Sequence, residues 1–195
     1  MAIGTGTASV QAAPIHYSET QSPDLPLFAE TMTPLTLDLG SNTVSGSVSS
    51  HFNSATGAPI TFDFDSFAFT VPAGMAVDSI SVTAAHGNTG DLNFSATWSL
   101  GQGNYNSALY TELVQKKVPF DLYAPTTTTT FVTPGTALFA GDYSMNETTM
   151  LSQYTNSGVY LFTLNVVDAA SLPEPASLTA VMAGTLTLLA RRRSR

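Results

Sequence analysis

The chain of 195 residues contains no cysteine and few charged side chains. Without cysteine it has no disulfide bond, no thiolate metal site and no cysteine nucleophile, so packing alone must hold its core. Charged residues make up 10% of the sequence, and the helix-forming residues Lys, Glu and Leu do not occur in long runs. We therefore expect little helix in the main body of the chain.

Basic residues are scarce outside the C-terminus. The six basic residues are Lys116, Lys117, Arg191, Arg192, Arg193 and Arg195. Residues 1–172 therefore carry 13 acidic against two basic side chains, a net charge of −11. A surface of this sign repels a phosphate backbone, so we expect no nucleic acid among the partners.

The sequence also lacks the patterns that are typical of enzymes. His16, His51 and His86 lie near the N-terminus or in turn-like segments, and no serine elbow or zinc motif accompanies them. Asp63 and Asp65 are too close along one strand to flank a substrate as the acid and base of a glycosidase. We expect a protein that is not an enzyme and that needs no cofactor.

The sequence does contain many apolar residues that alternate with Ser, Thr or Asp, as half-buried β-strands require. The alternation is cleanest over 92–100, which places Trp98 in the core. The threonine run 126–130 suits an edge strand, and 158–166 predicts a nearly continuous apolar strand buried between two sheets. Strands at this spacing predict an all-β fold, an antiparallel β-sandwich of jelly-roll type.

Two segments predict more specific local structure. Leucines at alternate positions of 35–39 precede the turn-forming residues 40–42, which together predict a hairpin. The apolar residues of 62–71 change phase near Ser66, and a β-bulge there would keep all of them on the inner face.

Asp63 and Asp65 are the candidate metal ligands of the body. They point the same way along a strand, and with Asp91 or Asp142 they offer the oxygen ligands of Ca²⁺, which needs about six to eight. The simpler interpretation is that both carboxylates face solvent opposite the phenylalanines of their strand, where they favour solubility and discourage edge pairing. No EF-hand spacing accompanies them.

Four tyrosines that we expect to be exposed lie near loops that are rich in Asn and Gly, namely Tyr105, Tyr110, Tyr123 and Tyr143. Exposed tyrosine rings can stack on sugars, although tyrosine is equally common as an ordinary loop anchor. The pattern leaves a carbohydrate-binding module, directed at exopolysaccharide, as an alternative function.

The N-terminal part of the chain divides into two segments before the body. Residues 1–13 are uncharged and end in small residues, as before a signal-peptidase cut, but they lack a basic start and an apolar run of about 7–15 residues. We interpret them as the remnant of a signal peptide whose start lies upstream, or else as a flexible N-terminus. Residues 14–34 contain three prolines and predict an extended lead-in, so the body spans 35–168.

Residues 169–195 combine three signals in a fixed order. Pro173, Glu174 and Pro175 come first, an apolar stretch over 178–190 follows, and the arginine cluster ends the chain. The prolines form a stiff extended element, the apolar run can enter a bilayer as a short helix, and arginines prefer the cytoplasmic side. The run 176–190 has 15 residues, and a spanning helix usually has about 20.

This order closely resembles the PEP-CTERM sorting signal of Gram-negative bacteria that make exopolysaccharide, over roughly the last 25 residues. In that family an exosortase, a transpeptidase-like membrane enzyme, recognises the tail and cuts near the Pro-Glu-Pro element. The residues that match the sorting motif are Pro173, Glu174, Pro175, Arg191, Arg192, Arg193 and Arg195. The resemblance implies export, transient anchoring in the inner membrane with the body in the periplasm, and final delivery to the cell surface or the extracellular matrix.

The body itself resembles, more loosely, the bacterial pre-peptidase C-terminal type of β-sandwich. The segments that carry this likeness are 40–46, 63–74 and 158–166. They are turn and strand patterns that unrelated sandwiches share, so they imply an architecture and no ligand. We therefore expect a structural or adhesive protein of the cell envelope or the biofilm matrix.

Overall fold

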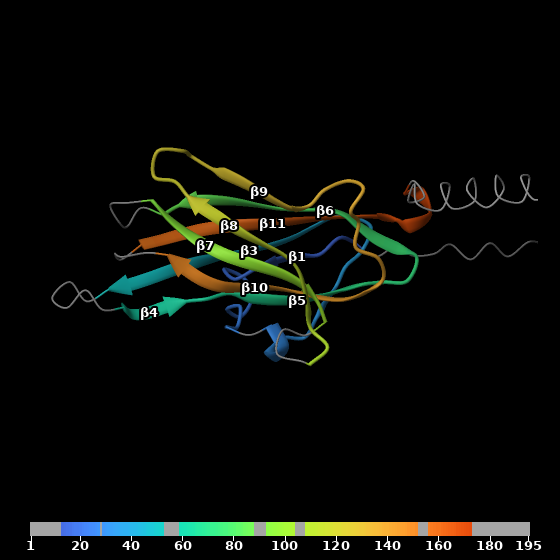
Figure 1. Ribbon diagram of the computed structural model, residues 1–195, viewed down its shortest axis with the longest axis horizontal. Helices are drawn as coiled ribbons and strands as arrows, with labels where there is room; N and C mark the ends of the chain where they lie inside the picture. The colour runs from blue at the N-terminus through green and yellow to red at the C-terminus, as the bar shows by residue number, and fades with distance from the viewer. Residues whose placement is uncertain are drawn as a thin grey trace, which may run out of the picture.

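A computed structural model describes residues 13–27, 29–52, 59–87, 93–103, 108–151 and 156–172. They form two β-sheets, whose strands run along the longest axis of the molecule (Figure 1), and two short 3-10 turns, Ala29–Thr31 and Ala169–Ser171. The predicted all-β sandwich is thereby confirmed. The predicted C-terminal helix lies outside the described residues, and among those residues no helix is long and apolar enough to cross a bilayer.

The first sheet has the strand order β1-β3-β11-β6-β9, and β4 pairs with the far part of β3. Its central strand β11 is antiparallel to both neighbours, whereas β1 runs parallel to β3. The threonine-rich β9 lies at the edge, as the run 126–130 predicts. The strands of this sheet are β1 His16–Ser18, β3 Gly40–Phe52, β4 Pro59–Asp63, β6 Met75–His86, β9 Thr127–Val132 and β11 Asn156–Asp168.

The second sheet has the order β2-β5-β10-β7-β8. Its central strand β10 is antiparallel to β5 and to β7, and its register against β7 shifts between Glu147 and Thr149. The strands of this sheet are β2 Leu35–Thr36, β5 Ser66–Val71, β7 Phe94–Gln102, β8 Thr111–Phe120 and β10 Gly141–Leu151.

Aromatic side chains from both sheets fill the space between the layers. The ring of Phe162 on β11 meets Trp98 at 4.9 Å and Phe67 at 5.3 Å between centroids, both in edge-to-face geometry. Such pairs add to the stabilisation that burial provides. Trp98 is fully buried, which confirms the prediction from the alternating run.

The strand β11 is buried on one face only. Tyr160, Phe162 and Leu164 point into the core, while Val159 and Leu161 between them are 55% and 40% exposed. The prediction that 158–166 is buried between two sheets was therefore wrong. Each sheet of a sandwich packs its inner face and leaves its outer face to solvent, even where apolar residues occupy that face.

The two segments for which the sequence predicts a hairpin and a β-bulge are instead crossovers between the sheets. The leucine-rich β2 belongs to the second sheet and β3 to the first, so no hairpin joins them. Likewise β4 belongs to the first sheet and β5 to the second, with Phe64 and Asp65 between them. The phase change near Ser66 is thus a change of sheet, and the predicted β-bulge was wrong.

The segment 14–34 lies against both sheets next to this second crossover. The Thr43 N–H of β3 donates to the Ile15 carbonyl at 2.8 Å, and the Ser66 N–H of β5 donates to the Pro26 carbonyl at 2.9 Å. Leu25 is buried in the core. These contacts bring the N-terminal residues to the place where the chain changes sheet.

Candidate metal centre

Three carboxylates meet where the N-terminal segment covers the crossover between β4 and β5. One carboxylate oxygen each from Glu19, Asp24 and Asp65 lie within 4.8 Å of one another. We call Glu19, Asp24 and Asp65 the carboxylate triad. Two of its members come from the turn after β1 and one from the crossover, so the triad joins parts of the chain that are distant in sequence.

Asp65 is the buried member of the triad, with no exposed surface. Its Oδ2 accepts a hydrogen bond of 2.8 Å from the Tyr160 hydroxyl, whereas its buried Oδ1 has no partner among the described residues. Burial, followed by the negative charge of Glu19, raises the pKa of Asp65 to about 8. A buried carboxylate oxygen without a partner is costly, so this position favours a proton or a bound cation.

Glu19 organises the turn that holds Asp24. Its Oε1 accepts from the Leu25 N–H at 3.1 Å and its Oε2 from the Ser47 N–H at 2.8 Å. Burial raises the pKa of Glu19, and these two N–H donors partly offset that rise. Tyr17 supports the same turn, because its hydroxyl donates to the Pro23 carbonyl. The carboxylate of Glu19 is therefore fixed, while Asp24 is exposed at the rim.

Gly46 on β3 makes room for two of these side chains. A Cβ atom at this position would lie 2.3 Å from Oε2 of Glu19 and 2.4 Å from the hydroxyl oxygen of Tyr160. Both distances are shorter than any tolerable contact. Glycine is thus required here because side chains from two other segments approach the β3 backbone.

Two further acids, Glu147 and Asp63, lie beside the carboxylate triad. Glu147 on β10 accepts from the Asp65 N–H at 3.3 Å through Oε2, and its buried Oε1 finds no partner in the described part of the chain. Burial raises the pKa of Glu147 to about 9. Asp63 is half-buried, and burial raises its pKa as well. The cluster therefore concentrates acidic groups away from bulk water, where burial favours their neutral forms unless a cation binds.

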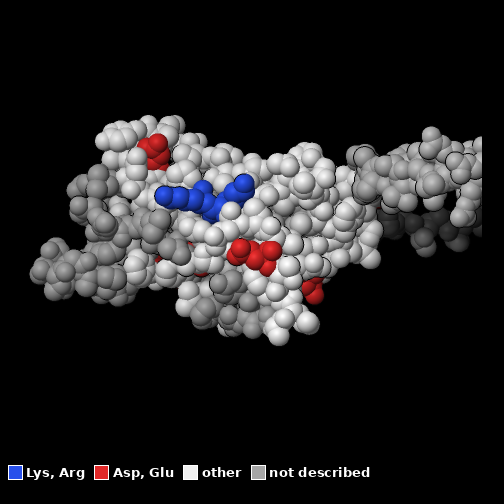
Figure 2. All heavy atoms as spheres, in the orientation of Figure 1, with Lys and Arg blue, Asp and Glu red and all other residues white. Residues whose placement is uncertain are grey.

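Compensating positive charge lies elsewhere on the molecule. The basic residues of the described part are Lys116 and Lys117 on β8, which is the strand of the second sheet farthest from β2 and three places from β5. A mostly uncharged face with a single blue patch is visible in Figure 2. The charged groups that act on Asp65 are Glu19, Asp63 and Asp24, all of them acidic. A cation from solution would offset this repulsion.

The sequence predicted part of this cluster. Asp65 belongs to the triad, so the interpretation that it faces solvent was wrong; the chain leaves the first sheet after Asp63 and turns Asp65 inward. Asp142 lies apart, accepting from the Thr70 hydroxyl at 2.7 Å, and Asp91 is outside the described residues. Glu19 was missed, although it continues the alternation of Ile15 and Tyr17 towards the body.

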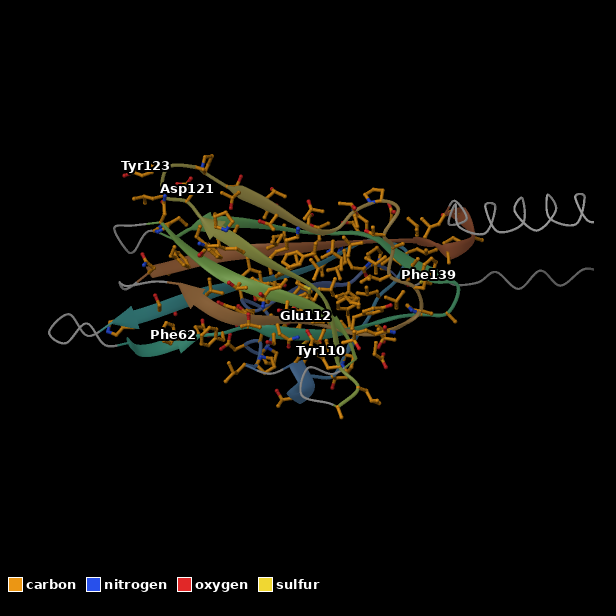
Figure 3. The ribbon with its side chains drawn as sticks, viewed as in Figure 1. Phe62, Tyr110, Glu112, Asp121, Tyr123 and Phe139 are labelled. Atoms are coloured by element: carbon orange, nitrogen blue, oxygen red, sulfur yellow. The ribbon has the colours of Figure 1, made fainter. Side chains whose placement is uncertain are left out.

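A second candidate surface lies at the loop between β8 and β9. His86, Gly87 and residues 121–125 line a hollow of about 380 Å³. Tyr123 is 86% exposed beside it, and Figure 3 shows Tyr123 and Asp121 together at one end of the molecule. His86 contacts the Gly87 carbonyl at 2.5 Å and the edge of Phe94. An exposed ring at a hollow can stack on a flat ligand face.

The other loop tyrosines do not share this exposure. Tyr143 is buried and stacks on Phe69 at 5.5 Å, so its predicted exposure was wrong. Tyr110 packs over Gly101, where a Cβ atom would lie 2.1 Å from its ring. Tyr105 lies outside the described residues.

The sorting motif lies beyond the last described residue, Leu172. The body ends in the 3-10 turn Ala169–Ser171, whose N-cap Asp168 accepts from the Ala170 N–H at 2.9 Å. Leu172 lines a hollow of about 670 Å³ together with Phe139, which is 51% exposed (Figure 3). The predicted motif residues Pro173, Glu174 and Pro175 follow the last described residue in the sequence, and the terminal arginines come after the apolar run.

Comparisons with known proteins yield little. No family model matches the chain, and no curated protein matches it. A solved structure described as "CBM4 structure and function" is similar at 11% identity, with a TM-score of 0.29, over 63% of this chain and 94% of that chain. A likeness at this level carries no argument about what this chain binds.

Proposed function

We propose that the chain is an exported cell-envelope or biofilm-matrix protein with a structural or adhesive role, and that residues 169–195 are its sorting tail. The observation that supports this most is the order of Pro-Glu-Pro, apolar run and arginine cluster directly after the body. The last strand before the tail, β11, has partners on both sides, so a cut after Leu172 removes no described strand. The body can therefore stay folded when the tail is lost.

The charge distribution supports one orientation. Residues 1–172 are strongly acidic and the last five residues contain four arginines, and positively charged flanks stay on the cytoplasmic side. The tail would sit in the inner membrane with the body in the periplasm, and an exosortase-type enzyme would be the partner that cuts near Pro173–Pro175. The processed body would then act at the cell surface or in the matrix by contact and without catalysis.

Cell fractionation of four versions of the chain tests the sorting role. They are the intact chain, a version with Pro173, Glu174 and Pro175 changed to Ala, a version truncated after Leu172, and a control in which every terminal arginine becomes Lys. In a host with the processing enzyme, we expect the intact chain and the control to yield a shortened body outside the inner membrane. The alanine version should stay uncut in the membrane fraction. Identical mass and location for the intact and alanine versions would refute the proposal.

A second candidate function is binding of exopolysaccharide, and the exposed Tyr123 beside Asp121 and His86 favours it. Saturable binding to the exopolysaccharide of the host should then weaken in Tyr123→Ala. The control Tyr143→Phe changes a buried tyrosine and should bind normally. Equal binding by both variants, or none by the intact protein, would exclude this use of the hollow.

A further inference from the structure

We propose that the carboxylate triad of Glu19, Asp24 and Asp65 is a Ca²⁺ site that fastens the N-terminal segment to the crossover between the two sheets. This inference concerns the body alone and does not depend on the sorting tail. It differs from the pairing of Asp63 with Asp65 that the sequence suggests, because two of the three ligands come from the turn after β1.

The spacing of the triad suits a single ion. Ca²⁺ binds oxygen at about 2.3–2.6 Å, so two ligands on opposite sides of the ion are about 4.6–5.2 Å apart. The three carboxylate oxygens lie within 4.8 Å of one another, so one Ca²⁺ can contact all three. Mg²⁺ demands near-ideal octahedral geometry and gives up its water reluctantly, which makes it the less suitable ion for a site of three protein carboxylates. The donors are all hard oxygens, the kind that Ca²⁺ prefers over nitrogen or sulfur.

Asp65 provides independent support for a ligand at this place. Its side chain is fully buried, its Oδ2 is held by Tyr160, and its Oδ1 has no hydrogen-bond partner within the described chain. The hydrogen bond at Oδ2 therefore fixes the orientation of the Asp65 carboxylate, and Oδ1 is left to bind a cation. An acid placed at random on the surface would instead have water around both oxygens.

The surroundings of the triad are built to hold it in place. The N–H groups of Leu25 and Ser47 position the Glu19 carboxylate, and Gly46 leaves the space that it occupies. Asp24 is exposed, so water can reach the ion and complete the about six to eight oxygens that Ca²⁺ requires. The acids Asp63 and Glu147 lie next to the site, and the charged groups of the described chain that act on Asp65 are all acidic.

Calcium titration of the purified full chain in detergent, after removal of metal with EDTA, tests the proposal. We expect Ca²⁺ to bind with measurable heat, to raise the melting temperature, and to protect the segment 14–34 from proteolysis. Asp65→Asn and Asp24→Asn should each weaken Ca²⁺ binding by about tenfold or more, the loss that changes around a metal typically cause. The matched control Asp142→Asn alters an exposed acid that is bonded to Thr70 and should bind normally.

Different results would overturn the existence of the site, the choice of ion, or its location. A full chain that shows neither heat nor a melting shift with Ca²⁺ would overturn the proposal. An equal response to Mg²⁺ would overturn the choice of ion, and an equal loss in Asp142→Asn would overturn the location. Asp24→Asn changes only the exposed ligand, so it remains decisive if Asp65→Asn fails to fold. None of these outcomes depends on whether the tail is processed.

Discussion

Gly46→Ala tests in one substitution how closely the N-terminal segment is fitted to the sandwich. The new Cβ atom would lie 2.3 Å from Oε2 of Glu19 and 2.4 Å from the hydroxyl of Tyr160. Neither side chain can retreat freely, because Glu19 accepts from Ser47 and Tyr160 donates to Asp65. Overpacking costs about 1–3 kcal/mol, and losing one of these hydrogen bonds costs about 1 kcal/mol more. We expect the free energy of unfolding to fall by about 2–4 kcal/mol.

Urea unfolding followed by tryptophan fluorescence measures this loss. Trp98 is the one tryptophan of the chain and is fully buried, so its emission reports on the core. The titration is run with EDTA and with saturating Ca²⁺. In Gly46→Ala, the stabilisation that Ca²⁺ adds should be largely absent, because the displaced Glu19 no longer reaches the ion.

Gly158→Ala is the matched control for this experiment. Its Cβ atom would lie 2.2 Å from the ring of Phe120, so it overpacks the core at the ring pair of Phe94 and Phe120 and leaves the carboxylate triad alone. We expect a similar loss of stability with the full Ca²⁺ increment retained. Wild-type stability in Gly46→Ala would refute the packing argument. A full Ca²⁺ increment in that variant would show that Glu19 is not a ligand.

Three further predictions concern the core and the buried acids. Phe162→Ala removes the ring that Trp98 and Phe67 contact, and urea unfolding should show a loss of about 3–5 kcal/mol; a loss below about 1 kcal/mol would contradict the core assignment. Tyr160→Phe removes the hydroxyl that donates to the Asp65 carboxylate. In EDTA this variant should unfold with a free energy about 1–3 kcal/mol lower than that of the wild type. An unchanged free energy of unfolding would contradict this prediction. Burial raises the pKa of Glu147 from 4.5 to about 9, so in EDTA the stability of the wild type should fall as pH rises across this interval. Glu147→Gln should lessen that slope, leaving the part due to Asp65 and its acidic neighbours, and an unchanged slope would show that Glu147 ionises freely.

The sequence predicts those features that a short window of residues determines. Alternation over 92–100 identifies a strand with one buried face and places Trp98 in the core, because the period of two follows from strand geometry alone. The threonine run 126–130 likewise predicts an edge strand correctly. The same rule does not predict the exposed outer face of β11, because Val159 and Leu161 on that face are apolar.

Features that depend on which sheet a strand joins could not be read from the sequence. The alternation of 35–39 and the phase change near Ser66 are both real, but each marks a crossing between layers. Such crossings are decided by pairing with residues far along the chain, for example β3 with β11. For the same reason Asp65 was recognised as a candidate ligand, while its partners Glu19 and Asp24 were not.

The position of β11 at the centre of the first sheet has a consequence for the order of folding. It is the last strand of the described residues, yet it separates β3 from β6, which are both synthesised long before it. Until residues 156–168 are available, those two strands each present an open edge, and open edges invite pairing with other chains. An exported polypeptide that crosses the inner membrane N-terminus first would therefore close its sandwich only as the tail reaches the membrane. Slow exit or early truncation would expose the two unpaired edges and favour aggregation at that moment.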